Sequence, residues 1–331
     1  MNAPTDYPLR RAWKLPAAMW ALSTVGFFAV YISAVLTQEG QFVENSALDA
    51  SSYANQQRAL LNLVTIPNLL LATIVLAVLG AAFRGVRSGL RVLAMIVAAN
   101  VLTQLLKYAV LSRPDFVEAA SDNTFPSGHT VVFASVLLGL LMVLPAAVRP
   151  FTGILVAAVL GTVAFQLLEF GWHRASDVVG GVLLVVAMVA LAHLLLPDRR
   201  PGGILVRRGF GAGSTARIAE RMGRAGAAHG STALGSTTHG STAHGSAAHG
   251  SSGREGRATY RPNAFNRALV WGLLGVAALT IVGGAGFAAL LAVNQDLAST
   301  HNLLLATQII CVAATTSAVL TTLALQRTRL A

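Results

Sequence analysis

Long apolar runs dominate the hydrophobic pattern of the chain, and short polar segments separate them. A transmembrane helix needs roughly 20 consecutive, mostly apolar residues. Eight runs meet this requirement, at about 16–37, 59–82, 92–111, 129–148, 151–170, 178–196, 268–293 and 303–325. The pattern therefore predicts an all-α, polytopic membrane protein.

The runs fall into two groups. Residues 1–198 are predicted to form a six-helix membrane domain, and residues 263–331 a two-helix transmembrane hairpin. Residues 199–262 between them are rich in Gly, Ala, Ser, His and Arg, and repeat a five-residue unit that ends in His-Gly-Ser. This segment has too few large apolar residues to build a core, so we predict a disordered cytoplasmic linker. Its flexibly spaced histidines offer no fixed geometry for a metal ion.

Composition supports a membrane protein and excludes one tempting alternative. Of the 331 residues 54% are hydrophobic and 11% charged, whereas soluble domains carry about 25% charged residues. The net charge of +11 suggests nucleic-acid binding at first sight. Basic cytoplasmic loops explain that charge better, so no nucleic-acid partner is predicted. The single cysteine, Cys311, lies in an apolar run and cannot form an internal disulfide.

The charges between the runs alternate in sign. The N-terminus, the loop at 83–91, the stretch after the sixth run and the C-terminus are basic. The loops at 38–58 and 112–128 are mainly acidic. Because basic loops face the cytoplasm, both termini are predicted to be cytoplasmic and the acidic loops to face outward. We expect a multi-pass protein of the plasma membrane.

Polar residues gather at the outward end of the third run. Asn100, Gln104 and Lys107 recur on one helical face, and such residues usually face the interior of a bundle. Arg113 precedes Pro114 and so lies where the helix ends. A guanidinium there can bind two phosphate oxygens at once. The alternatives are a lysine that extends to the interface and an arginine that binds lipid headgroups.

Ser127 and Gly128 directly precede the fourth run, which begins at His129. Ser127 is a good N-cap, and Gly128 lets a ligand approach the backbone closely. Free N–H groups in the first turn of a helix bind anions. His129 would lie beside such an anion and could protonate a leaving oxygen. Alone, these three residues more often form a simple turn, but they fall at the same membrane face as Lys107 and Arg113.

His173 and Asp177 lie four residues apart, directly before the sixth run. A neutral imidazole that a carboxylate holds at one nitrogen can attack phosphorus with the other. The alternative is a helix-capping aspartate beside an interfacial histidine. The sequence contains no cysteine cluster and no HExxH motif, so we predict neither a metal site nor a cofactor.

Three motifs in this order resemble the signature motifs of the type 2 phosphatidic acid phosphatase family, over about residues 60–198. They are Lys107 with Arg113-Pro114, then Pro126-Ser127-Gly128-His129, then His173-x-x-x-Asp177. The resemblance implies a six-helix core and a metal-independent lipid phosphatase that passes through a phosphohistidine. It implies His173 as the nucleophile, Asp177 as its partner and His129 as the general acid. It assigns phosphate binding to Lys107, Arg113, Ser127 and Gly128.

Two departures from the family pattern matter. Five residues separate Lys107 from Arg113, where the family has six. The family also has an arginine six residues before the nucleophile, and Leu167 stands there. Arg174 is the candidate replacement. If it supplies the cation, Arg174→Ala should reduce activity at least as much as Arg113→Ala, and Leu167→Arg should restore part of the loss.

The missing arginine leaves three functions open. The first is hydrolysis of a lipid phosphomonoester or diphosphate, and the second is transfer of the phosphoryl group to a lipid or glycan hydroxyl. The third is phosphate-lipid binding without catalysis. The expected partners are a lipid phosphate substrate and membrane lipids.

The seventh run carries small residues every four positions: Thr280, Gly284, Ala288 and Ala292. Such stripes mark helix contacts in membranes. The hairpin is therefore predicted to pack on its own core or to form a homo-oligomer, and to be dispensable for chemistry.

Overall fold

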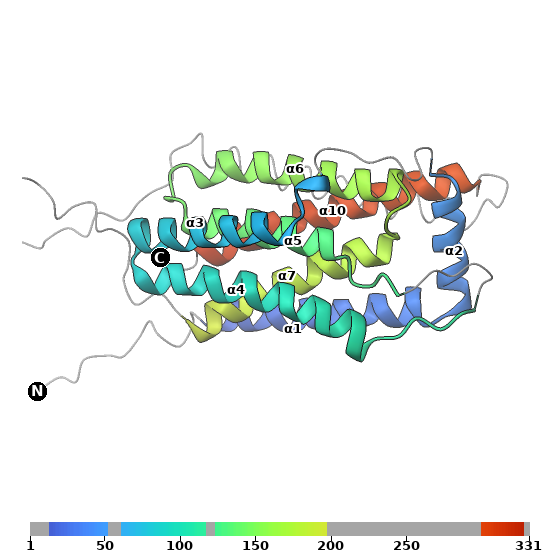
Figure 1. Cartoon of the computed structure of the whole chain (residues 1–331), viewed down its shortest axis with the longest axis horizontal. Helices are drawn as coiled ribbons and strands as arrows, with labels where there is room; N and C mark the ends of the chain where they lie inside the picture. The colour runs from blue at the N-terminus through green and yellow to red at the C-terminus, as the bar shows by residue number, and fades with distance from the viewer. Residues whose placement is uncertain (1–12, 52–60, 117–122, 197–298, 328–331) are drawn as a thin grey trace, which may run out of the picture. The chain divides into compact units, whose positions relative to one another are not determined.

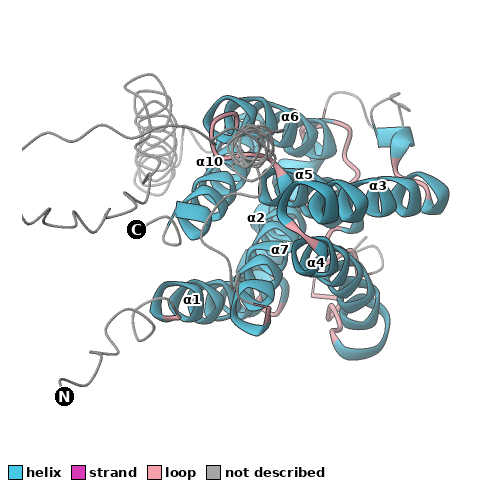
Figure 2. Cartoon of the chain, turned by 90° about the vertical axis from the view of Figure 1, so that its left-hand side faces the viewer, coloured by secondary structure: helices cyan, strands magenta, loops and turns pink. Residues whose placement is uncertain are grey.

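The computed structural model describes residues 13–51, 61–116, 123–196 and 299–327, all of which belong to one compact unit. Every regular element in these ranges is a helix, and the long helices run side by side as a bundle (Figures 1 and 2). The helices are α1 Lys14–Val30, α2 Gln38–Asp49, α3 Ile66–Arg84, α4 Val86–Leu105, α5 Gly128–Val143, α6 Arg149–Glu169, α7 Ala175–Leu195 and α10 Thr300–Arg327. The protein is an all-α polytopic membrane protein, as predicted.

Six helical stretches in the described residues are long and apolar enough to cross a membrane. They are Lys14–Val35, Ile66–Arg84, Val86–Val110, Arg149–Glu169, Ala175–Leu195 and Thr300–Gln326. The fourth predicted run forms α5, which is also apolar but has only 16 residues. The seventh predicted run and the predicted linker lie outside the described residues, so the three-segment division of the chain stays a prediction.

The start of α3 differs from the predicted boundary at 59. The helix begins at Ile66 because the Thr65 hydroxyl caps it, accepting a hydrogen bond from the Asn68 N–H at 3.4 Å. Pro67 in the first turn has the fixed backbone angle that a helix start favours. At the other end Gly85 joins α3 to α4 with φ +93°, a conformation that side-chain-bearing residues rarely adopt.

The interpretation of 38–58 as an acidic loop was wrong for its first half, which forms helix α2. The Thr37 hydroxyl caps the helix by accepting from the Gly40 N–H at 3.0 Å. The helix buries Gln41, Glu44 and Ala47, which share one face. Because two of these three residues are polar, hydropathy did not reveal the helix. Figure 1 shows α2 lying across one end of the bundle.

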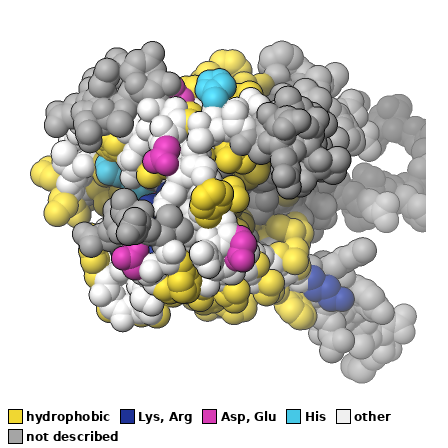
Figure 3. All heavy atoms as spheres, turned by 90° about the vertical axis from the view of Figure 1, so that its right-hand side faces the viewer, with side chains coloured by type: hydrophobic (Ala, Val, Ile, Leu, Met, Phe, Trp, Pro, Cys, Tyr) yellow, Lys and Arg dark blue, Asp and Glu magenta, His cyan; other side chains and the backbone are white. Residues whose placement is uncertain are grey.

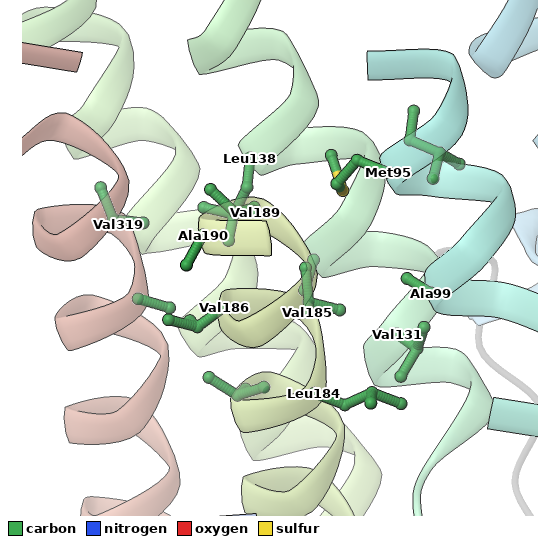
Figure 4. Close-up of a cluster of buried hydrophobic side chains, with 14 of the residues drawn as sticks. Met95, Ala99, Val131, Leu138, Leu184, Val185, Val186, Val189, Ala190 and Val319 are labelled. Atoms are coloured by element: carbon green, nitrogen blue, oxygen red, sulfur yellow. The ribbon is translucent and has the colours of Figure 1, made fainter. Parts of the chain in front are cut away.

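Helix α7 forms the centre of the core. It packs against α1, α4, α5 and α10, and it is apolar around its whole circumference, which suits a buried helix. Figure 4 shows its valines and alanines between those of the neighbouring helices. Gly180 in α7 allows a close approach, since a Cβ atom there would lie 2.4 Å from the Phe125 ring. The segment that leads into α5 can therefore lie directly against α7.

Helix α10 completes the bundle by packing against α6, α7 and α2 (Figure 2). Its residues Leu304 and Cys311 are buried in an apolar cluster with Leu167 and Leu168 of α6. The last predicted run thus contributes to the same core as the helices of the predicted six-helix domain.

Candidate functional site

The elements that carry the predicted site residues all end at the α2 end of the bundle (Figure 1). One group follows the end of α4, a second begins α5, and a third begins α7. In chain order these residues are Lys107, Arg113, Ser127, Gly128, His129, His173, Arg174 and Asp177. The structure thus brings together residues that are up to 70 positions apart in the sequence.

The backbone around Arg113 is held by buried side chains from the first two helices. The Tyr31 hydroxyl donates to the Ser112 carbonyl at 2.6 Å and accepts from the Ser112 N–H at 3.1 Å. The Gln41 amide donates to the Pro114 carbonyl at 2.6 Å. These contacts fix the backbone on both sides of Arg113, whose side chain is 1% exposed.

Lys107 lies in a short π-helical turn, Leu106–Val110, that extends α4. The Asn123 amide donates to its carbonyl at 3.3 Å. The ammonium lies 5.5 Å from the centre of the exposed Tyr108 ring, and the residue is half-buried. Lys107 is therefore less tightly placed than Arg113.

Ser127 is the N-cap of α5. Its hydroxyl accepts from the Thr130 N–H at 3.2 Å and from the Thr130 hydroxyl at 3.0 Å. Its own N–H donates to the Asp177 carbonyl at 2.9 Å, which joins the start of α5 to the start of α7. Beside Gly128 there is room, since an added Cβ would find its nearest neighbour, the Gln104 amide nitrogen, at 3.8 Å. The first turn of α5 therefore has space beside it at Gly128, and anion binding there stays a prediction.

His173 and Asp177 face each other across the first turn of α7. The distance from His173 Nδ1 to Asp177 Oδ2 is 3.5 Å, longer than a good hydrogen bond. Asp177 is fully buried, and its Oδ2 also accepts from the Thr124 hydroxyl at 2.6 Å and the Arg174 N–H at 3.0 Å. The His129 ring lies 5.7 Å from the His173 ring, centre to centre. The carboxylate is therefore fixed, and the two imidazole rings lie beside each other.

Arg113 connects this pair to a second carboxylate that the sequence analysis missed. Its Nη2 lies 3.4 Å from Asp177 Oδ1 and 3.7 Å from Glu44 Oε2. Glu44 also accepts from the Ser176 N–H at 2.7 Å and the Ser176 hydroxyl at 2.9 Å. Burial, and next the Asp177 charge, raise the pKa of Glu44 to about 7.

The overlooked acid could have been found from the local pattern. Thr37 is an N-cap residue, and Gln41, Glu44 and Ala47 follow it at helical spacing. That pattern marks a short helix with one polar face, but it does not show what the face packs against.

Arg174 lies at the N-cap of α7 and is 4% exposed. Its Nε donates to Asn45 Oδ1 at 2.9 Å, and its Nη1 to the Thr124 hydroxyl at 3.4 Å. Burial, and next the Arg113 charge, lower the pKa of the Arg174 guanidinium. A second guanidinium thus lies at the same end of the bundle as Arg113, and its role as the replacement cation stays a prediction.

Leu167 stands where the family arginine is missing. Its side chain is fully buried in the apolar cluster that contains Leu304 and Cys311. Its carbonyl accepts from the N–H groups of Trp172 at 3.1 Å and His173 at 3.2 Å, so its backbone positions the nucleophile candidate. An arginine side chain would enter an apolar space that α10 partly fills. The structure therefore changes the expectation for Leu167→Arg from rescue to destabilisation.

Four buried side-chain atoms in the described residues have no hydrogen-bond partner: Gln41 Oε1, Arg113 Nε, Gln166 Oε1 and His173 Nδ1. All four belong to elements at the α2 end of the bundle. A small pocket there is lined by Glu44, His173 and Arg174 together with Thr307 of α10. Figure 3 views this end, where mainly apolar and uncharged atoms reach the surface and few basic ones do. Unpartnered buried polar atoms mark a place where water or a ligand completes the bonding.

Comparison with known proteins agrees with the motifs. Residues 88–201 match the model of the PAP2 superfamily, from α4 through α7. The predicted resemblance to the type 2 phosphatidic acid phosphatase family is thereby confirmed, and it supports a phosphatase-like function. No curated protein and no solved structure gives a significant match. Helices α1, α2 and α10 lie outside the matched segment, and so does Glu44.

Proposed function

We propose that the protein is an integral membrane phosphatase that hydrolyses a lipid phosphomonoester or diphosphate through a phosphohistidine. The arrangement of three side chains carries the proposal. Asp177 lies at His173 Nδ1, and the His129 ring lies beside the His173 ring, 5.7 Å away from centre to centre. A site that only binds phosphate needs cations and N–H groups but no oriented pair of imidazoles.

In the first step His173 Nε2 attacks phosphorus. The phosphorus–oxygen bond to the lipid breaks, and His129 donates a proton to the departing oxygen. Burial, and next the charges of His173 and Lys107, lower the pKa of His129 to about 4 in the empty site. A bound phosphoryl anion raises this pKa and so favours the protonated ring. Asp177 accepts a hydrogen bond from Nδ1–H, which leaves Nε2 unprotonated for the attack and stabilises the charge that forms on the ring. The 3.5 Å distance shortens when substrate binds, as catalytic hydrogen bonds often do.

In the second step water attacks the phosphohistidine. His129, now neutral, accepts a proton from the water, and the phosphorus–nitrogen bond breaks. Inorganic phosphate leaves, and both imidazoles return to their starting states. Arg113, Lys107 and the first-turn N–H groups of α5 neutralise the phosphoryl oxygens in both steps.

The location of the site suits a lipid substrate. The site lies at the end of apolar helices, where a lipid headgroup would lie, and their outward faces expose large apolar side chains. The positive-inside rule supports a site on the outer side of the plasma membrane, with both termini in the cytoplasm.

Phosphate release from lipid phosphates by the purified protein tests the proposal. The panel is phosphatidic acid, a polyprenyl phosphate and a polyprenyl diphosphate, each with and without EDTA. Wild-type protein should release phosphate with or without chelator, and His173→Ala should not. His301→Ala is the matched control, since His301 is an exposed histidine at the start of α10.

Two other results would redirect the assignment. Phosphate that appears on an added lipid or glycan alcohol instead of in water would indicate a phosphotransferase. Binding of lipid phosphate without release, in wild type and His173→Ala alike, would indicate a non-catalytic binding protein.

A further inference from the structure

Glu44 is the one acid of the site that comes from outside the segment matched by the family model. It is 7% exposed and lies on the buried face of α2. Both of its carboxylate oxygens accept hydrogen bonds from Ser176 in the first turn of α7. Oε2 also faces Arg113 Nη2 at 3.7 Å. Glu44 thus contacts both the arginine that is to bind phosphate and the helix that carries His173.

The charges explain why this contact matters. The Nη2 group of Arg113 lies between two carboxylates, those of Glu44 and Asp177. Its Nε is buried and has no hydrogen-bond partner in the described residues. A phosphoryl group would bring further negative charge to the same guanidinium. With both acids ionised, the phosphate must compete with two anions for one cation.

We propose that Glu44 is a positioning residue for phosphate binding: in its protonated form it releases Arg113 to the phosphoryl oxygens, and in its ionised form it retains Arg113 and repels them. The inference deepens the proposed function and rests on it for the identity of the ligand. It makes the affinity of the site for tetrahedral anions dependent on the proton of an acid that belongs to α2.

The neighbours of Glu44 are consistent with this role. Its charged and titratable neighbours are Arg113 after α4, Asp177, Arg174 and His173 at the start of α7, and Cys311 on α10. Burial and the Asp177 charge raise the pKa of Glu44 to about 7, and Ser176 and Arg113 oppose that rise. Its ionisation therefore falls in the neutral range, above that of an ordinary glutamate.

Anion binding to the full-length protein tests the inference without turnover. Isothermal titration with inorganic sulfate suits this purpose, because sulfate carries two charges throughout pH 5.5–8.5. Glu44→Gln is compared with Glu39→Gln, which removes an exposed glutamate from the same helix. At pH 5.5 both variants should match wild type. At pH 8.5 Glu44→Gln should bind sulfate more tightly than the other two, on the order of tenfold, as expected for one charge several ångströms away.

A second variant shifts the pKa of Glu44 instead of removing its carboxyl group. Ser176→Ala deletes a hydrogen bond that favours the ionised form of Glu44. The pH at which sulfate affinity declines should therefore shift upward. If Glu44→Gln loses affinity with rising pH as steeply as Glu39→Gln, or if Ser176→Ala leaves the midpoint unchanged, the inference is wrong.

The same data separate this inference from the proposed function. Sulfate binding with the predicted dependence on Glu44, in a protein that never releases phosphate, would overturn only the phosphatase assignment. Phosphate release by a protein in which Glu44→Gln and Glu39→Gln behave alike would overturn only the role of Glu44.

Discussion

The two ends of the helix bundle both bury arginine and histidine, but they bond them differently. At the end opposite α2, Arg91 donates to the Leu196 carbonyl through Nε at 2.7 Å and also through Nη2. Arg84 donates to the Met142 carbonyl at 2.9 Å and to the Gln326 side chain at 3.0 Å. Backbone carbonyls and an amide satisfy these guanidinium groups.

The buried histidine at that end is bonded in the same manner. His193 Nδ1 donates to the Val189 carbonyl at 2.7 Å, and Nε2 accepts from the Gln326 amide at 3.0 Å. Both ring nitrogens have fixed partners, so the ring cannot act on a ligand without breaking a bond between α7 and α10. At the α2 end, by contrast, His173 Nδ1 and Arg113 Nε lack a good partner.

The difference distinguishes two kinds of buried polar group that have the same residue types. Buried polar groups that are fully bonded within the protein hold helices together. Buried polar groups that lack a hydrogen-bond partner destabilise the empty site, and a ligand that bonds them removes this cost. Residue type alone would have assigned the same role to both ends.

The largest expected effect is the loss of activity in His173→Ala. Without the nucleophile, phosphate release should fall by at least about 10³-fold. His193→Gln at the other end should lower the melting temperature and leave kcat near the wild-type value. If His193→Gln abolishes turnover while its melting temperature equals that of wild type, the proposed difference between the two ends is wrong.

Leu167→Arg should have the next largest effect, and on stability. The guanidinium would enter the apolar cluster against Leu304 and Cys311, which destabilises the protein by about 3–5 kcal/mol when no partner is present. Thermal unfolding in detergent measures the loss. Leu167→Met, which keeps the volume and polarity, is the control. A stable and more active Leu167→Arg protein would show that the family arginine site is still open.

Stability should also depend on pH through Glu44. Its pKa is raised to about 7, so between pH 4.5 and 7 the unfolded chain loses this proton while the folded protein keeps it. The stabilising contribution is therefore present in full below pH 4.5 and is lost as the pH rises to 7, by up to about 3 kcal/mol. Across this pH range the melting temperature should change less for Glu44→Gln than for wild type or Glu39→Gln.

Arg113→Lys should weaken substrate binding by about tenfold, because an ammonium cannot bind two phosphoryl oxygens as a guanidinium does. The effect should appear in KM, while the stability changes little. Arg91→Lys should do the reverse, lowering the stability and leaving KM unchanged, because its guanidinium bonds the Leu196 carbonyl at the opposite end of the bundle. If KM changes equally in both variants, the hydrogen bonding does not distinguish a ligand-binding arginine from a structural one.

Much of this arrangement could be predicted from the sequence, for a physical reason. Transmembrane helices must be apolar over their length, so runs mark them, and polar residues at run ends such as His129 and His173 stand out. Glu44 did not stand out, because it lies on a short helix whose buried face is polar. Nor could the sequence show that α10 covers Leu167, since that contact joins segments more than 130 residues apart.

The smallest perturbation tests which end faces outward. Cys311 is fully buried, so a cysteine introduced at the surface should be the only reactive thiol in the described part of the protein. Asp49→Cys places one at the end of α2, and Ala147→Cys places one in the exposed turn between α5 and α6 at the opposite end. Basic residues at that opposite end predict that it is cytoplasmic. An impermeant thiol reagent should therefore label Asp49→Cys in intact cells and Ala147→Cys only after lysis, with activity unchanged in both. The reverse pattern would place the site in the cytoplasm, and its lipid phosphates would then come from the inner leaflet.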